Sequence, residues 1–358
     1  MRFGRMGTAA LFVLATAGIA ATATAQQQAM AGDASAATAT KPWYKQPWNP
    51  ANVKACDRAC LVRIGETYLS ALESKSMATL PLAEQVIATE NTGKIDLGEG
   101  VLWRAAIKPT PFKVVVADPA YGQVAIQTVL NIDGKPALVA FRLRVERGMI
   151  TEAEQMYDRN VAPEAMELLQ KPVAVLTEDV PAKQRASREM LKYAAESYFD
   201  ALTGEDGRIA AFAPDCVRHE QGYQTVFNKQ PGRASPSPKL PDLSTEQGRT
   251  FSRLSTMTCE EQVSTGIFVG MKRIWPHRAL VIDEQKQLVA TFPFFVHDGT
   301  KRPFQGKPAA PGPIAMVLNL TMMETFAIRN SQIKHVEAFP FVIVPYGTGD
   351  GWTHPKLH

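Results

Sequence analysis

The sequence predicts an α+β protein in which one folding unit occurs twice in tandem. Residues 68–72, Tyr-Leu-Ser-Ala-Leu, are matched 130 positions later by residues 198–202, Tyr-Phe-Asp-Ala-Leu, and an acid followed by an amide comes 22 residues after each tyrosine: Glu90-Asn91 and Glu220-Gln221. A late match pairs residues 145–150, followed by Glu154, with residues 328–333, followed by Glu337. A unit of more than about 100 residues can bury its own core, so this is a duplicated domain rather than a solenoid.

Helical periodicity comes first in each unit. Apolar residues recur at spacings of three and four: Leu61, Ile64, Tyr68, Leu69 and Leu72 in the first unit, and Met190, Leu191, Ala194, Tyr198 and Leu202 in the second. This pattern predicts an amphipathic helix at the start of each unit. A short second helix or a turn is expected at residues 80–85 and 207–213.

Alternating patterns that predict antiparallel strands follow the helices. In the first unit they cover residues 86–90, 101–107, 114–116, 124–132, 138–147 and 150–156, with turns at Asp133-Gly134 and Arg147-Gly148. In the second they cover residues 216–220, 268–272, 277–283, 288–297, 316–329 and 332–341. Helices followed by such a meander predict helices packed on one face of a curved sheet.

The first 25 residues have the pattern of an export signal. Arg2 and Arg5 precede an apolar run at residues 11–21, and Ala23-Thr24-Ala25 is a small-residue cleavage site. The mature protein is therefore expected to be soluble and periplasmic or secreted. Residues 26–54 predict a flexible leader and an arm that carries Trp43, Tyr44 and Trp48.

Charge and motifs exclude several classes of partner and enzyme. The net charge is +4, and no run of Lys and Arg is interleaved with aromatics, so nucleic acid is not an expected partner. No later stretch is apolar enough to span a membrane. The chain has no G-x-S-x-G elbow, no P-loop and no H-E-x-x-H motif.

Four cysteines in an exported chain suggest disulfides. A bridge between Cys216 and Cys259 is favoured, and a local bridge between Cys56 and Cys60 is the second candidate. Zinc is the competing interpretation, but there is no second close cysteine pair and no histidine nearby in a ligand pattern. No metal and no cofactor are expected.

Several motifs resemble the nuclear transport factor 2-like superfamily, also named SnoaL-like. The likeness is carried by residues 56–71, 89–91 and 98–103 in the first unit, and by residues 198–202, 216–225 and 281–283 in the second. The chain is also similar to exported two-repeat proteins of that kind, which are largely uncharacterised. The resemblance implies that each unit is a cone of curved antiparallel sheet closed by its N-terminal helix, and that the two cones pair sheet against sheet as an internal pseudo-dimer. The protein would then be a monomer or a homodimer.

The expected domain boundaries follow from this resemblance. They are a signal peptide at residues 1–25, a leader and aromatic arm at 26–54, a first repeat at 55–157, a linker with one helix near 164–170 at 158–187, a second repeat at 188–345 with insertions at 229–250 and 298–313, and a tail at 346–358.

The second repeat carries the candidate catalytic residues, because all histidines of the chain lie in or after it. They are Tyr198, His219, Glu220, Glu324 and His297. His219 and Glu220 are adjacent, so on a strand only one of them can line the cone. Glu324 lies in an apolar stretch, which leaves two interpretations, an exposed strand position or a buried catalytic acid. Tyr198 could instead be a core aromatic, and Glu90 and Glu220 could anchor a backbone segment or an arginine.

Candidate substrate-binding residues in the second repeat are Tyr223, Arg273, Trp275, Phe294 and Phe295. The resemblance implies general acid and base chemistry on a small aromatic or apolar molecule. The expected reaction is a dehydration, an isomerisation, or a carbon–carbon cleavage that releases formaldehyde from aryl-propane diols. Two alternatives stay open, a non-catalytic small-ligand-binding protein and a cell-surface interaction module that uses the proline-rich insertions.

Overall fold

The computed structural model describes residues 56–229, 243–268, 270–299 and 317–353. The expected signal peptide, the leader, and most of both expected insertions lie outside these residues. Among the helices that are described, none has the length and apolar character needed to cross a membrane.

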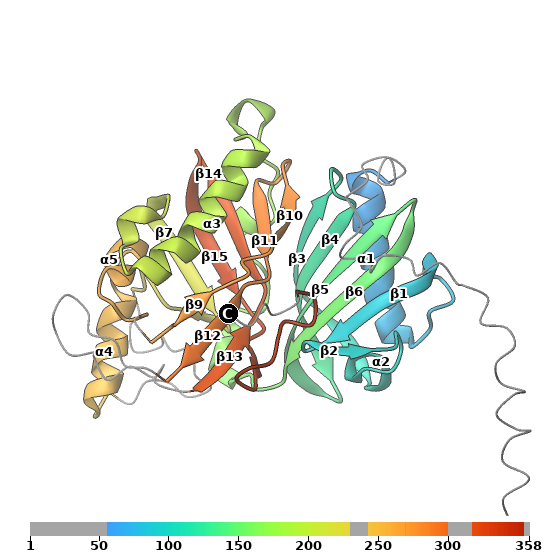
Figure 1. Cartoon of the computed structure of the whole chain (residues 1–358), viewed down its shortest axis with the longest axis horizontal. Coiled ribbons are helices and arrows are strands. Elements are labelled where there is room, and N and C mark those ends of the chain that lie inside the picture. Colours follow the sequence, from blue (N-terminus) through green and yellow to red (C-terminus); the bar gives the residue numbers. More distant parts are fainter. Residues whose placement is uncertain (1–55, 230–242, 269, 300–316, 354–358) are drawn as a thin grey trace, which may run out of the picture. The chain divides into compact units, whose positions relative to one another are not determined.

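The first repeat contains one long helix and one six-stranded sheet (Figure 1). Its elements are α1 (Arg58–Ser74), β1 (Leu82–Glu90), β2 (Gly93–Ile95), α2 (Val101–Arg104), β3 (Ile107–Asp118), β4 (Gln123–Ile132), β5 (Lys135–Glu146) and β6 (Met149–Asp158). The strand order is β2-β1-β6-β5-β4-β3, and all neighbours are antiparallel except β1 and β6. Three short 3-10 helices follow in the linker, at Pro163–Glu167, Ala174–Leu176 and Ala182–Gln184.

The second repeat has the same plan with an additional sheet. It contains α3 (Arg188–Gly204), a 3-10 turn at Gly207–Ile209, β7 (Phe212–Glu220), β8 (Tyr223–Gln224), α4 (Glu246–Ser255), α5 (Cys259–Val263), β9 (Arg273–Ile274), β10 (Ala279–Asp283), β11 (Leu288–Thr291), β12 (Phe294–Asp298), β13 (Val317–Thr321), β14 (Glu324–Arg329), β15 (Gln332–Ala338) and β16 (Val342–Val344). Six strands form the order β10-β11-β14-β15-β7-β8, and four form β16-β13-β12-β9. The predicted α+β class with two tandem units is confirmed.

The duplication is visible in the details of each helix and its first strand. Both α1 and α3 have 17 residues and begin after a capping side chain, Asp57 or Ser187, that accepts a hydrogen bond from a backbone N–H in the first turn. Both end at a residue with positive φ, Lys75 or Glu205. Each of these equivalent positions is separated by the 130 residues that the sequence comparison indicated.

Two long predicted strands of the second repeat are each divided in two. The expected strand at 288–297 becomes β11 and β12 on either side of Pro293, whose nitrogen has no hydrogen to donate to a ladder. The expected strand at 316–329 becomes β13 and β14, interrupted at Met322 and Met323. Because β11 and β14 pair in one sheet while β12 and β13 pair in another, the two breaks turn the chain from one sheet into the next.

Three local predictions were wrong. The stretch 80–85, expected as a helix or turn, includes the start of β1, and 101–107, expected as a strand, contains α2 because Glu90 accepts hydrogen bonds from the N–H groups of Val101 and Leu102. No strand is described at residues 268 and 270–272, and the two-residue strand β9 begins only at Arg273. Short apolar runs do not distinguish a helix from a strand by periodicity alone.

Each repeat has its own core between its helix and its sheet. Tyr68 and Phe141 belong to the first of these cores, and Tyr198 and Phe326 belong to the second. A third cluster joins the two repeats through the opposite sheet faces, and it includes Phe112 against Phe339 with ring centroids 5.5 Å apart. The linker residues Ala165, Leu169 and Leu176 belong to this shared cluster.

Two reciprocal ion pairs join the repeats. Arg58 of α1 donates to Asp283 of β10 from Nη2 at 2.8 Å, and Arg188 of α3 donates to Asp118 of β3 from Nη1 at 2.8 Å. Each aspartate also accepts a backbone N–H across the contact, from Ala117 to Asp283 and from Ile282 to Asp118. Equivalent residues therefore exchange the same contacts in both directions, as in a two-fold symmetric dimer.

These aspartates are buried, and removing the charge should therefore destabilise the protein. The side chain of Asp283 is 1% exposed, and D283N would leave Arg58 without its anionic partner. We expect D283N to lower the free energy of unfolding in urea by about 3 kcal/mol or more. The matched control is E66Q, which removes an exposed ion pair with Lys113 and should change the free energy of unfolding by less than about 1 kcal/mol. Equal effects of the two substitutions would contradict a structural role for the buried pair.

Candidate functional site

Two acids share the face of the second sheet that α3 covers. Glu324 of β14 lies beside Ala338 of β15, and Ala338 lies beside Glu220 of β7. Residues opposite one another in a ladder point to the same face, and Ala338 belongs to the core beneath α3. The backbones of the two acids are therefore about 9–10 Å apart, with the methyl group of an alanine between them.

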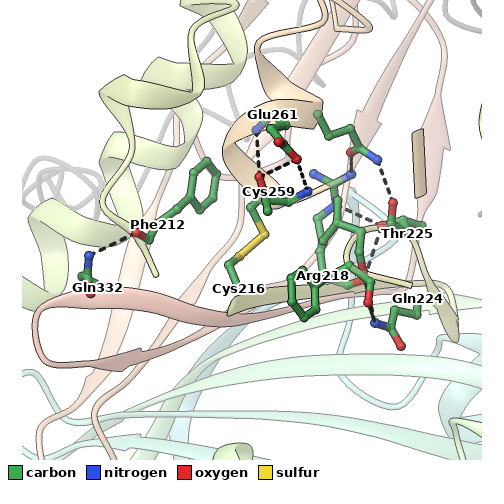
Figure 2. Close-up of a disulfide and its surroundings, with 12 residues drawn as sticks. Phe212, Cys216, Arg218, Gln224, Thr225, Cys259, Glu261 and Gln332 are labelled. Atoms are coloured by element: carbon green, nitrogen blue, oxygen red, sulfur yellow. Dashed lines mark hydrogen bonds between the residues drawn. A yellow bond between two sulfur atoms is a disulfide. The ribbon is translucent and has the colours of Figure 1, made fainter. Parts of the chain in front are cut away.

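Arg218, two residues before Glu220 on β7, extends from the same face (Figure 2). Its Nε lies 2.9 Å from Glu220 Oε1, Nε also donates to Thr225 Oγ1, and Nη2 donates to Gln262 of α5. Burial lowers the pKa of Arg218, but Glu220 and Tyr198 raise it by more, so that the net shift is upward and the guanidinium keeps its charge. Its Nη1 is buried and has no hydrogen-bond partner among the described residues.

The disulfide between Cys216 and Cys259 fixes α5 over this end of β7 (Figure 2). Both disulfides that the sequence suggested, Cys216–Cys259 and Cys56–Cys60, are present. In α5, Gln262 accepts from Arg218 and donates to the carbonyl groups of Thr225 and Leu254. The bridge therefore holds the element that orients Arg218.

Glu324 is a buried acid, so the alternative of an exposed strand position was wrong. Its residue is 2% exposed, and its Oε2 has no hydrogen-bond partner within the described part of the chain. Burial, together with the charge of Glu220, raises the pKa of Glu324 to about 8, although Arg218 acts in the opposite direction. Near neutral pH this carboxyl group can both hold and release a proton.

Tyr198 packs from α3 onto the same region of the sheet. Its ring lies 5.2 Å from the ring of Phe326, and the phenol lies near enough to Arg218 for the two groups to shift each other's pKa. Burial raises the pKa of Tyr198, with a lowering effect from Arg218 that is smaller. The phenol is therefore a proton-bearing hydrogen-bond group rather than a base. Tyr198, Arg218, Glu220 and Glu324 form what we name the cone cluster.

His219 is not part of the cone cluster. It points to the opposite face of β7, where its Nδ1 lies 3.2 Å from Glu337 Oε2. The two acids and His219 cannot share the cone, because adjacent residues of a strand point to opposite faces. Glu220 is the member of this pair that faces the cone, so His219 as a base inside the cone is corrected.

His297 lies on β12, in the four-stranded sheet, two residues after Phe295. Its Nδ1 is buried without a hydrogen-bond partner among the described residues, and burial lowers the pKa of His297 to about 4. The imidazole is therefore neutral near neutral pH. The charge that acts on the His297 imidazole is that of Asp298, and no residue of the cone cluster contributes to its pKa shift.

The predicted substrate-binding residues are dispersed. Phe295 is buried in the core beneath α3, whereas Phe294 and Tyr223 belong to the cluster between the repeats. Arg273 is exposed, and Trp275 is 63% exposed. The structure therefore brings only Phe295 of this set to the core that contains Tyr198.

A surface groove of about 440 Å³ lies outside the cone. It is lined by the linker residues Glu164, Glu167 and Leu168 and by residues 222–224 and 227–229 after β7. Tyr223 borders it and is 4% exposed, and no member of the cone cluster lines it.

The equivalent positions in the first repeat carry side chains that hydrogen bond within the protein. Glu90 caps α2 through the N–H groups of Val101 and Leu102, and Tyr68 donates to Gln155 Oε1 at 2.9 Å. Both alternatives for the matched acids thus occur, since Glu90 anchors a backbone segment and Glu220 pairs with an arginine. The first repeat contains no histidine, the side chain whose ordinary pKa lies nearest neutral pH.

Sequence reasoning did not select Arg218 or Gln262. Arg218 could have been found from its spacing, because residues two apart on a strand share a face and Glu220 was already a candidate. Gln262 had no comparable signal, since its position depends on how α5 folds back over β7.

Residues 184–340 match the family described as "Domain of unknown function (DUF8021)". This match covers the second repeat, which contains the cone cluster. No curated protein matches the chain.

Three solved structures are similar to parts of the chain. An NTF2-like protein of unknown function from Cytophaga hutchinsonii is 17% identical, with a TM-score of 0.24, and the match covers 27% of this chain and 89% of that one. A protein of unknown function with a cystatin-like fold from Methylobium petroleophilum is 15% identical, with a TM-score of 0.25, and the match covers 29% of this chain and 78% of that one. A Kribbella flavida protein provisionally described as a ketosteroid isomerase is 18% identical, with a TM-score of 0.25 and coverage of 36% and 95%.

The raised pKa of Glu324 predicts a specific pH dependence of stability. The pKa of Glu324 is near 4.5 in the unfolded chain and about 8 in the folded protein. Between these pH values the unfolded chain has lost the proton while the folded protein still holds it, so the contribution of Glu324 to the free energy of unfolding falls as the pH rises. We therefore expect the free energy of unfolding of E324Q, relative to that of the wild type, to increase by about 2–3 kcal/mol between pH 5.0 and pH 7.5. Urea unfolding at both pH values measures it, with E66Q as the control. A wild-type-to-E324Q difference that is constant across this range would contradict the raised pKa.

Proposed function

We propose that the second repeat is an enzyme that acts without a cofactor, by general acid and base chemistry, on a small aromatic or otherwise apolar molecule. The observation that carries the proposal is the pair of buried, unpartnered polar atoms in an apolar interior, Glu324 Oε2 and Arg218 Nη1. Buried polar groups normally have partners, so two that lack them, on side chains whose charges act on each other, are candidates to meet a substrate. The pattern of residues 1–25 supports export.

The cone cluster divides the chemistry between two kinds of group. Glu324, with a pKa of about 8, is suited to take a proton from the substrate and to return it. Arg218 Nη1 and the phenol of Tyr198 can donate hydrogen bonds to a substrate oxygen on which negative charge develops. Glu220 keeps the guanidinium in place through its ion pair. The surrounding aromatic rings of Phe326 and Phe295 favour an apolar substrate.

This arrangement supports isomerisation or elimination next to an oxygen-bearing carbon. It also supports a formaldehyde-releasing cleavage of an aryl-propane diol. In that reaction Glu324 would take the proton of the primary hydroxyl, and the carbon–carbon bond would break to release formaldehyde. The electron pair of the broken bond would form a carbon–carbon double bond as the neighbouring hydroxyl leaves as water. Glu324, now protonated, would supply the proton for that water.

A second candidate function is binding without turnover. The surface groove beside Tyr223 and Phe227 favours it, because the groove combines apolar side chains with Glu164 and Glu167 and lies apart from the cone cluster. The proline-rich insertions, expected to support a surface interaction module, lie largely outside the described residues.

A matched pair of tyrosine variants tests the proposal. The protein is incubated with a panel of aromatic ketones and aryl-propane diols, and products are detected by mass spectrometry. We expect E324Q to lower kcat/KM by about 100-fold or more, and Y198F to lower it by about 10-fold. Y68F, the same change at the equivalent position of the first repeat, should leave turnover unchanged.

The pH profile gives an independent readout. If Glu324 must be ionised, kcat/KM should rise with pH up to about 8 and then level off, and E324Q should lose this rise. Wild-type turnover by both E324Q and Y198F would refute the assignment. Panel molecules that bind but are recovered unchanged would support the binding protein instead.

A further inference from the structure

Three buried side chains meet on the face of the second sheet that is turned away from α3. His219 of β7 lies opposite Glu337 of β15 in the parallel ladder, and His335 lies two residues before Glu337 on the same strand. All three therefore point to one face. Glu337 Oε2 lies 3.2 Å from His219 Nδ1 and 3.1 Å from His335 Nε2, and the three atoms lie within 4.8 Å of one another. Their side chains are 6%, 4% and 2% exposed for His219, His335 and Glu337.

We propose that His219, His335 and Glu337 form a buried binding site for one divalent transition-metal ion, and that Zn²⁺ is the ion that this set of ligands fits best. The site is separate from the cone cluster, because it lies on the opposite face of the sheet. The ion would join β7 to β15 on the sheet face that meets the first repeat.

The geometry supports a shared ion. Zinc takes histidine nitrogen at about 2.0–2.1 Å and carboxylate oxygen at about 2.0–2.2 Å, so neighbouring ligand atoms of a tetrahedral ion are about 3.3 Å apart. The two distances from Glu337 are close to this value. Two imidazoles and one carboxylate on three ligand positions leave a fourth for water.

The first repeat shows what normally accompanies a buried acid at this position. Glu154 is the equivalent of Glu337, and Arg142 and Arg278 both pair with it, at 2.9 Å and 2.7 Å. Arg142 lies opposite Glu154 in the ladder, whereas Thr325, which is neutral, lies opposite Glu337. Thr89, the residue opposite Glu154 on β1, is replaced by His219.

Glu337 thus has no counterpart, among the described residues, of the two guanidinium groups that neutralise Glu154. Among the described residues, the interactions that act on the Glu337 carboxyl come from His219 and His335. Hydrogen bonds alone would place both imidazole N–H groups on one oxygen and leave a buried carboxylate without a cation, which is costly. A divalent ion supplies the charge that two arginines supply in the first repeat.

Metal content and binding test this site. The protein is produced under oxidising conditions without a histidine tag, and zinc is measured by mass spectrometry before and after treatment with a chelator. Titration of the stripped protein with Zn²⁺ is followed by calorimetry, and titration with Co²⁺ is followed by its visible absorption. We expect about one ion per chain.

Conservative variants locate the ion. H219Q and H335Q keep a side chain that can hydrogen bond to Glu337 but is a poor zinc ligand, and each should weaken binding at least 10-fold. H277Q, which changes a half-buried histidine outside the site, should bind like the wild type. Circular dichroism verifies folding, and E337Q replaces any variant that does not fold.

Three outcomes would overturn the proposal. They are a wild-type chain that takes up neither Zn²⁺ nor Co²⁺, a double variant H219Q/H335Q that retains the ion, and an H277Q variant that loses it to the same extent. None of these readouts depends on enzymatic activity, so the metal site and the proposed function can fail independently.

Discussion

The reciprocal exchange of Arg58 with Asp283 and of Arg188 with Asp118 is the constraint on which the arrangement of the two repeats depends. Each arginine begins one repeat's helix, and each aspartate ends a strand of the other repeat. The same aspartates also accept backbone N–H groups across the contact. Burying the apolar faces between the sheets provides most of the association energy, but it is not directional, whereas these charged hydrogen bonds fix one relative position.

With that position fixed, the two copies could change independently inside. The interior of the first cone keeps Tyr68 bonded to Gln155 and uses Glu90 to cap a helix. The interior of the second keeps Tyr198 but places Arg218 and Glu324 near it. When the contact between the two copies of a duplicated fold is complete, one copy can lose its function while the other keeps buried polar groups that lack hydrogen-bond partners. Functional sites often break the rules of core packing in this way.

Much of the fold could be predicted from the sequence. The 130-residue offset placed both helices, because helical periodicity over 17 residues is a strong signal. The breaks at Pro293 and at Met322 were missed, because an apolar run has the same pattern whether it continues in one sheet or crosses to another. The cone cluster was predicted in part: Tyr198, Glu220 and Glu324 were selected, but Arg218 was not. The choice between His219 and Glu220 stayed open, because period-two alternation does not indicate which of two adjacent residues faces inward.

The contacts that complete the first repeat come from far along the chain. Glu154 receives Arg278, 124 residues later, and Thr89 receives the indole N–H of Trp352, 263 residues later. During vectorial synthesis the first cone would therefore emerge with a buried acid and a buried hydroxyl still lacking these partners. Its final native state must wait for Arg278 and Trp352, which makes the assembly of this duplicated protein a late and long-range event despite the local character of each half.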